Sequence, residues 1–189
     1  MKIIRIITRM NVGGPSQNVS ILNHYIPNSV LIYGSLSEGE GDMSYLVQDL
    51  KTYYISELQR EINLIKDFKA FLKIYDIIKF ERPDIIHTHL SKSGMLGRIT
   101  GMLFRRSNSN DTRLYHTFHG NILTGYFGGL KSFIFILIER FLARHTTNII
   151  AISESQKQEL LKYKIGDDEK IKVIELGLDL EKFYDRNMQ

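Results

Sequence analysis

The sequence of 189 residues contains no cysteine, so it has no disulfide framework and cannot use thiolate chemistry. It also lacks a long hydrophobic run. The longest uncharged apolar stretch, residues 133–138, is far shorter than the roughly 20 residues that a membrane-spanning helix needs. Arg5 interrupts the apolar start of the chain and glycines soon follow, so we expect no signal peptide. The lack of cysteine is compatible with a reducing cytoplasm.

The composition is that of an ordinary soluble globular protein, with 43% hydrophobic and 24% charged residues. The length suits one well-filled domain and is short for two. The formal net charge of +4 is mild. It is compatible with an anionic ligand or with a membrane surface, and it predicts neither of them.

Short β-branched runs alternate along the chain with segments of helical periodicity. Strands are expected at residues 3–8, 29–33, 52–55, 84–89, 112–117, 148–152 and 171–174. Helices are expected at residues 15–25, 42–50, 65–80, 93–104, 130–144 and 154–163. This alternation predicts an α/β fold, a single Rossmann-like domain whose mostly parallel sheet of about seven strands carries helices on both faces. We place the domain at residues 1–180 and the start of a linker at 181–189.

Histidines gather at two of the predicted strand ends. One strand contains His116 and runs on to His119 and Gly120, and the strand before it in the sequence ends in His87 and His89. In open α/β sheets, ligands bind beyond such strand ends. His119 is the strongest candidate for a functional residue, because Gly120 frees the backbone beside it for a ligand. For His87 and His116, hydrogen bonding within the strand end is at least as good an interpretation.

A third strand end runs into Gly13 and Gly14, which precede Pro15 at the expected start of a helix. Backbone N–H groups and a helix N-terminus together form a natural cradle for an anion, although two such glycines are more often only a turn. A nicotinamide cofactor is disfavoured. The sequence has no G-x-G-x-x-G, and no acidic residue ends the second strand to hold a ribose.

Four basic residues, Lys92, Arg98, Lys131 and Arg144, are expected on the segments that flank the histidines. Each alone suits a solvated surface, and together they could hold a phosphate or another anionic acceptor. A metal centre at the histidines is disfavoured, because no carboxylate accompanies them in the sequence.

Two of the expected helices are amphipathic. In the segment 65–80 the apolar positions are Phe68, Phe71, Leu72, Tyr75 and Ile78. In the segment 130–144 a continuous stripe is expected to pack on the sheet; it consists of Leu130, Phe133, Ile134, Leu137, Ile138, Phe141 and Leu142. The apolar residues left off this stripe, Phe127, Phe135 and Ile136, have Lys131, Arg140 and Arg144 close by. That combination suits weak contact with an anionic lipid surface.

Taken together, five motifs resemble the N-terminal domain of retaining family-4 glycosyltransferases of the GT-B fold. The motifs are ITRMNVGGP at 7–15, GEGDM at 39–43, RPDIIHTH at 82–89, HTFHG at 116–120 and ISES at 152–155. The resemblance covers nearly the whole chain. It is strongest to the bacterial branch that forms polysaccharides, through residues 125–127 and 139–140.

The resemblance implies one half of an enzyme with two Rossmann-like domains, in which the N-terminal domain binds the acceptor and the C-terminal domain holds a nucleotide-sugar. Gly13 and Gly14 would then approach the donor diphosphate, and His119 would contact the transferred sugar. The acceptor-binding candidates are His87, His89, Lys92, Arg98, Lys131 and Arg144. The resemblance implies no metal and no cofactor besides the nucleotide-sugar substrate. The expected location is the cytoplasm, with weak contact to the inner face of the membrane.

Two departures from the family pattern affect this interpretation. The family's Pro-Asn-Gly-Val-Asp segment is replaced by ELGLD at residues 175–179. The second domain, with its Glu-x7-Glu donor motif, is not in the sequence, and no two glutamates here have that spacing. We therefore expect the chain alone to be inactive. The alternative is a non-catalytic module that binds a glycan or a lipid phosphate.

Overall fold

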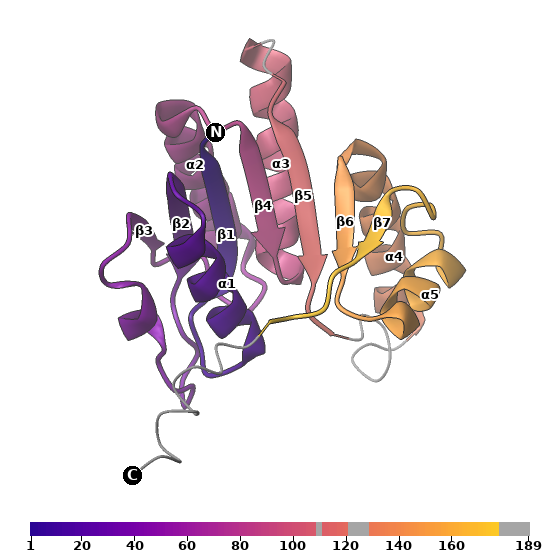
Figure 1. Cartoon of the computed structure of the whole chain (residues 1–189), viewed down its shortest axis with the longest axis horizontal. Coiled ribbons are helices and arrows are strands. Elements are labelled where there is room, and N and C mark those ends of the chain that lie inside the picture. Colours follow the sequence, from indigo (N-terminus) through magenta and orange to yellow (C-terminus); the bar gives the residue numbers. More distant parts are fainter. Residues whose placement is uncertain (109–110, 121–128, 178–189) are drawn as a thin grey trace.

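The computed structural model describes residues 1–108, 111–120 and 129–177 (Figure 1). The described strands are β1 (Ile3–Arg9), β2 (Ser29–Gly34), β3 (Thr52–Ile55), β4 (Ile85–His89), β5 (Arg113–Phe118), β6 (Asn148–Ala151) and β7 (Ile171–Val173). The described helices are α1 (Gly14–Tyr25), the 3₁₀ helix η1 (Ser44–Val47), α2 (Leu64–Glu81), α3 (Ser91–Asn108), α4 (Gly129–His145) and α5 (Glu154–Lys162). The expected linker at 181–189 lies outside the described residues.

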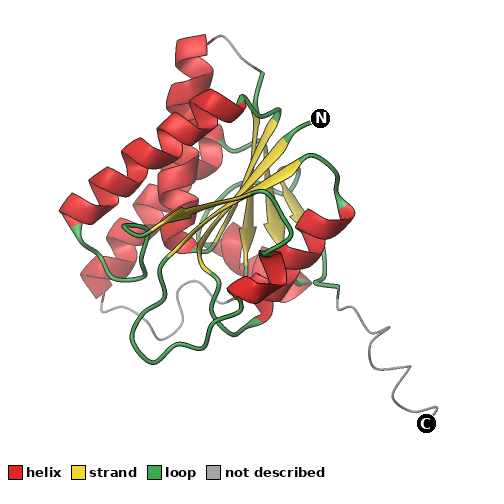
Figure 2. Ribbon diagram, turned by 90° about the vertical axis from the view of Figure 1, so that its left-hand side faces the viewer, coloured by secondary structure: helices red, strands yellow, loops and turns green. Residues whose placement is uncertain are grey.

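The strands form one parallel sheet in the order β3-β2-β1-β4-β5-β6-β7, which confirms the predicted Rossmann-like fold. Helix α1 covers one face of β1 and β2, while α2, α3 and α4 form a layer on the other face (Figure 2). Ile7, Val19 and Leu31 fill the α1 side of the core. Ile6 and Ile74 belong to the larger core between the sheet and the α2–α3 layer.

Two element boundaries differ from the prediction. Instead of a helix over 42–50, the chain forms the short η1, because the Asp42 carboxylate accepts a hydrogen bond from the Ser44 N–H at 2.7 Å and tightens the turn there. Helix α3 begins at Ser91 and continues to Asn108, so the expected loop after residue 104 is partly helical.

The buried faces of α2 and α4 also differ from the prediction. Of the five apolar positions expected in α2, only Phe68 and Leu72 are exposed. Phe71, Tyr75 and Ile78 pack on the core, and Ala70 and Ile74 complete the buried face. In α4 the expected core stripe is largely exposed, with Phe133, Ile134, Leu137 and Phe141 facing outward and only Leu142 of the described members fully buried. Phe135 and Ile136, expected to face outward, are half-buried instead. Leu130 and Phe127 lie outside the residues whose side chains are described.

Candidate active site

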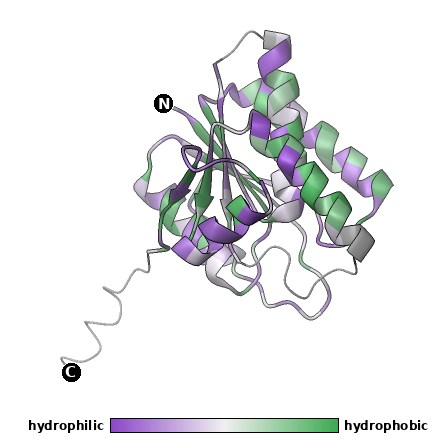
Figure 3. Ribbon diagram, turned by 90° about the vertical axis from the view of Figure 1, so that its right-hand side faces the viewer, coloured by the Kyte–Doolittle hydropathy of each residue, from purple (hydrophilic) through white to green (hydrophobic). Residues whose placement is uncertain are grey.

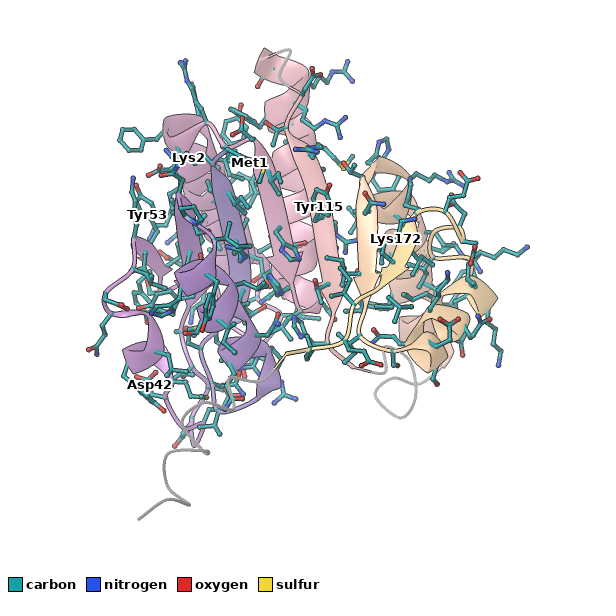
Figure 4. All side chains as sticks on the ribbon, in the orientation of Figure 1. Met1, Lys2, Asp42, Tyr53, Tyr115 and Lys172 are labelled. Atoms are coloured by element: carbon teal, nitrogen blue, oxygen red, sulfur yellow. The ribbon has the colours of Figure 1, made fainter. Side chains whose placement is uncertain are left out.

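The candidate site lies where the strand order reverses between β1 and β4. From β1 the chain moves outward to β2, and from β4 it moves the opposite way to β5. Ligands of open α/β sheets bind beyond the carboxyl ends of the strands at such a switch point. The site therefore lies on the same edge as Asp42, whereas Lys2 marks the opposite, amino edge (Figure 4).

Two histidines meet at this edge. His89, the last residue of β4, is fully buried, and its Nδ1 lies 2.8 Å from Nε2 of His119, which follows β5. Burial lowers the pKa of His119 to about 4 and holds the pKa of His89 well below its usual range. Both rings are thus neutral near pH 7, and one of these two nitrogens donates a hydrogen bond to the other.

One nitrogen of each ring remains unpaired within the described part of the chain, namely Nδ1 of His119 and Nε2 of His89. A buried polar atom without a hydrogen bond costs about 1–3 kcal/mol. A hydroxyl group of a bound ligand would relieve that cost, since a neutral imidazole can both donate and accept. The pair can therefore form hydrogen bonds with a hydroxyl group of a ligand, and it carries no positive charge for an anion.

The other two histidines are held more firmly. His87 is buried, and its Nε2 lies 2.8 Å from the Thr117 hydroxyl. His116 is fully buried on the α3 side of the sheet, with its Nδ1 2.8 Å from the Thr88 hydroxyl. A Cβ on Gly94 would stand 2.5 Å from the His116 ring, so α3 can approach β5 only with glycine there. These contacts favour the structural interpretation for both histidines.

The buried histidines His87 and His119 predict that the folded chain loses stability at acid pH. Burial is the main cause that lowers the pKa of His87 to about 3, and burial also lowers the pKa of His119 to about 4. In the unfolded chain the ordinary histidine pKa is about 6.5. Stability is thus complete above about pH 6.5 and falls as the pH drops toward the folded-state values, because only the unfolded chain takes up the protons.

Each of these two histidines is expected to remove about 2 kcal/mol of stability between pH 7 and pH 5. Urea unfolding at the two pH values measures the loss in the free energy of unfolding. In the variant His87→Gln that loss should be smaller by the contribution of one histidine. Equal unfolding midpoints of the wild-type chain at pH 7 and pH 5 would show that the rings are not buried in neutral form.

The glycines after β1 open the neighbouring part of the edge. Gly13 is the N-cap residue of α1 and Gly14 is its first residue. A Cβ on Gly14 would meet nothing within 4 Å, so open space lies beside the backbone at this helix N-terminus. An anionic group can approach there, and the positive end of the helix dipole favours it.

Comparison with known proteins identifies the family. The profile described as Glycosyltransferase Family 4 matches residues 39–182, more than two thirds of the chain. The chain belongs to this family. Its resemblance to the N-terminal, Rossmann-like half of GT-B glycosyltransferases is thereby confirmed.

Curated relatives of this family-4 chain are bacterial sugar transferases. It is 33% identical over 159 residues to the Escherichia coli UDP-Gal:alpha-D-GlcNAc-diphosphoundecaprenol alpha-1,3-galactosyltransferase, covering 84% of the chain and 40% of that protein. It is 30% identical over 145 residues to the Staphylococcus aureus capsular polysaccharide biosynthesis glycosyltransferase CapM, covering 72% of the chain and 37% of that protein. The chain thus spans about 40% of the length of these relatives.

Solved structures show the same fold. The lipopolysaccharide outer core galactosyltransferase WaaB in its apo form matches with a TM-score of 0.68 at 16% identity, over 96% of this chain and 47% of that one. A UDP-N-acetylglucosamine 2-epimerase matches with a TM-score of 0.65 at 14% identity, over 92% of this chain and 47% of that one. At these identities the likeness concerns the fold alone.

The basic residues of this family-4 chain do not form the expected group. Lys92 lies near the carboxyl edge, but its Nζ is 2.5 Å from the Asp67 carboxylate and also donates to the Glu61 carbonyl. Arg98 is fully buried, and its Nη2 donates to both carboxylate oxygens of Glu139 at 2.8 Å. We had expected Arg98 to bind an acceptor, but in this structure it is buried and paired with Glu139.

Arg144 is on the wrong edge for the expected role. Helix α4 runs antiparallel to the strands, so its last turn lies at the amino edge, where Arg144 lines a hollow together with Arg105 and Lys170. Lys131 belongs to the first turn of α4, but its side chain lies outside the described residues. Among the described residues, no group of three or more acidic or histidine side chains is placed to hold a metal ion.

Sequence reasoning missed the hydroxyl groups that support the site. The Thr8 and Ser93 hydroxyls lie 2.9 Å apart, and Ser93 also donates to the His89 carbonyl. These bonds tie the start of α3 to the ends of β1 and β4. The only signal in the sequence is the position of each residue at the end of a strand or the start of a helix.

Proposed function

We propose that this chain is the acceptor-binding half of a retaining glycosyltransferase, which transfers a sugar from a nucleotide-sugar to a glycan or lipid-linked acceptor. The observation that carries the proposal is the neutral His89–His119 pair at the switch point, beside the open N-terminus of α1. The curated relatives support it, since one is named for an acceptor linked to diphosphoundecaprenol and the other for capsular polysaccharide. A lipid-linked acceptor would place the enzyme at the cytoplasmic face of a membrane.

Each part of the site has a role in this proposal. His119 hydrogen-bonds a hydroxyl of the transferred sugar through the ring nitrogen that His89 leaves free. His89 fixes the orientation and the tautomer of the His119 ring. Gly13 and Gly14 let the donor diphosphate approach the N-terminus of α1, where backbone donors stabilise the charge that grows on the leaving phosphate.

The donor-binding half belongs, in this proposal, to the part of the relatives that the chain does not span. Transfer requires groups on both sides of the reacting bond. In this proposal the present chain holds the acceptor and contacts the transferred sugar and its diphosphate, whereas the other half holds the nucleotide. The chain alone should then bind an acceptor without completing the reaction.

A transfer assay tests whether the chain binds the acceptor but needs a second half for transfer. Purified chain is incubated with UDP-galactose and with a short-chain N-acetylglucosamine diphospholipid, the pair suggested by the Escherichia coli relative. We expect cooperative unfolding of the chain on its own, because the sheet has a complete core. We also expect binding of the diphospholipid and neither transfer nor hydrolysis of the nucleotide-sugar.

Turnover of the nucleotide-sugar by the purified chain would contradict the proposal that a second half is required. A folded chain that binds no diphospholipid, and none of a panel of sugar diphospholipids, would contradict the acceptor-binding role.

A further inference from the structure

Helix α5 carries a buried amide beside the loop that follows β5. The helix is mostly hydrophilic, as the view from its side of the molecule shows (Figure 3). The side chain of Gln156, in its first turn, is nevertheless only 3% exposed. Its Oε1 accepts a hydrogen bond from the Ile152 N–H at 2.8 Å, and its Nε2 donates to the Gly120 carbonyl at 2.7 Å. Both partners are backbone groups of fixed polarity, so they determine the orientation of the amide.

These two bonds connect segments that the sheet no longer joins. Strands β5 and β6 pair as far as Phe118, which lies opposite Ala151. Beyond this pair both strands end, and Gly120 is linked to Ile152 through the Gln156 amide instead. A side-chain amide has the same kinds of donor and acceptor as a peptide group. The Gln156 amide therefore continues the ladder between the two strands by one step.

The bond to Gly120 fixes the backbone next to His119. Phe118, before His119, is the last residue of β5 and is held by the sheet. Gly120, after it, is exposed, and an added Cβ there would meet nothing within 4 Å, so packing does not hold the chain at this point. The amide of Gln156 holds it. The His119 ring can then meet His89 on the other side at 2.8 Å.

Helix capping explains one half of this arrangement. Ser153 is the N-cap residue of α5, and its hydroxyl accepts a hydrogen bond from the Gln156 N–H. A glutamine or glutamate three residues after such a serine is the common capping pattern, in which the side chain accepts a bond from a backbone N–H before the helix. Here that N–H belongs to Ile152. Glutamate would suit this role at least as well, because a negative charge is favourable at a helix N-terminus.

The other half of the arrangement needs the amide nitrogen. The Gly120 carbonyl requires a donor, and an ionised glutamate side chain has none. A carboxylate in the same place would turn its second oxygen toward the Gly120 oxygen and repel it. The bond to Gly120 is thus what distinguishes glutamine from the other residue that capping allows.

We propose that Gln156 is a positioning residue for His119. It holds the Gly120 carbonyl, and thereby keeps the His119 ring against His89 at the carboxyl edge of the sheet. Gln156 itself contacts no ligand. The consequence for sugar transfer rests on the proposed function, in which His119 bonds the transferred sugar, whereas the positioning does not.

Nitrogen NMR of the histidine rings in the purified chain tests the positioning without any transfer reaction. In the wild type we expect one neutral tautomer for His119, because the bond to His89 determines which ring nitrogen carries the proton. Gln156→Glu and the uncharged Gln156→Met both remove the donor to Gly120. In both variants the His119 signals should move toward the average of the two tautomers.

Steady-state kinetics test the consequence in a protein that joins this chain to its donor half. Both Gln156 variants should lower kcat about 10–100-fold, because a displacement of about 1 Å at a reacting centre can cost up to 10²-fold in rate. The KM for the acceptor should change little, since Gln156 does not touch it. Unfolding curves should show that both variants remain folded, because α5 is anchored in the core by Leu160.

Gln158→Glu is the matched control, because Gln158 is exposed on the same helix and its amide bonds Glu154 rather than the loop. It introduces the same charge two residues away and should leave the His119 signals and kcat as in the wild type. An equal disturbance of His119 by Gln158→Glu would attribute the effect to charge on α5 and overturn the proposal.

Wild-type His119 signals in both Gln156 variants would also overturn the proposal, and so would loss of the fold in both, which would assign the amide to stability alone. Altered His119 signals with an unchanged kcat would support the positioning by Gln156 and contradict the role of His119 in the proposed function.

Discussion

In a protein that joins this chain to its donor half, His119→Ala is expected to lower kcat by about 10²–10³-fold. The reason is that His119 provides, on our account, a hydrogen bond to the sugar that is strongest in the transition state. The fold should persist, because His119 is only partly buried and follows the end of β5. Steady-state kinetics with the wild-type protein and the variant, together with their unfolding curves, measure both effects.

His145→Ala is the matched control for this experiment, because His145 is an exposed histidine at the opposite edge of the sheet. It should leave kcat unchanged. His89→Gln should lower kcat by less than the loss of His119 itself, because it disturbs the orientation of the His119 ring without removing it. If His119→Ala keeps near-normal turnover and loses stability instead, the residue is structural and the site lies elsewhere.

Glu139→Ala is expected to destabilise the chain by about 3–5 kcal/mol. Arg98 is fully buried, and its Nη2 donates to both carboxylate oxygens of Glu139 at 2.8 Å. Removal of the carboxylate leaves a buried positive charge without its partner. The midpoint and slope of urea unfolding give the change in free energy.

The double variant Arg98→Met with Glu139→Leu separates the charge from the packing. Replacing a buried ion pair by apolar residues of similar size is often close to neutral, so the double variant should be more stable than Glu139→Ala. If Glu139→Ala unfolds at the same urea concentration as the wild type, the ion pair is not buried as described.

The sheet could be predicted from the sequence, because strands and helices differ in the local spacing of their apolar residues. β-branched runs predicted all the described strands to within one or two residues, and the alternation predicted their parallel arrangement. The short η1 was not predicted, because the hydrogen bond that the Ser44 N–H donates to the Asp42 carboxylate is a feature of one particular turn.

The buried faces of α2 and α4 could not be predicted from the sequence in the same way. Both helices carry large apolar residues around much of their circumference, so the most populated stripe does not identify the side that meets the sheet. In α4 that side includes the small Ala143 and the charged Glu139. The burial of Glu139 depends on its ion pair with Arg98 of the neighbouring helix. A pattern within one helix contains no information about that partner.

The candidate site was predictable in part. Histidines at the ends of two strands indicated the right edge, but the contact of His89 with His119 depends on the pairing of β4 with β5, where His89 lies opposite Thr117. Spacing along the chain does not fix this register. The wrong placement of Arg144 has a similar origin, because the edge that it occupies depends on the direction of α4 relative to the sheet.

The most direct test of the account is a nitrogen NMR titration of the histidine side chains with UDP-galactose, in a protein that joins this chain to its donor half. The account predicts that the ring signals of His119 and His89 shift with added ligand, while those of His145 at the opposite edge do not. Shifts of His145 with unchanged signals from His119 would place the ligand at the amino edge and contradict the assignment of the site.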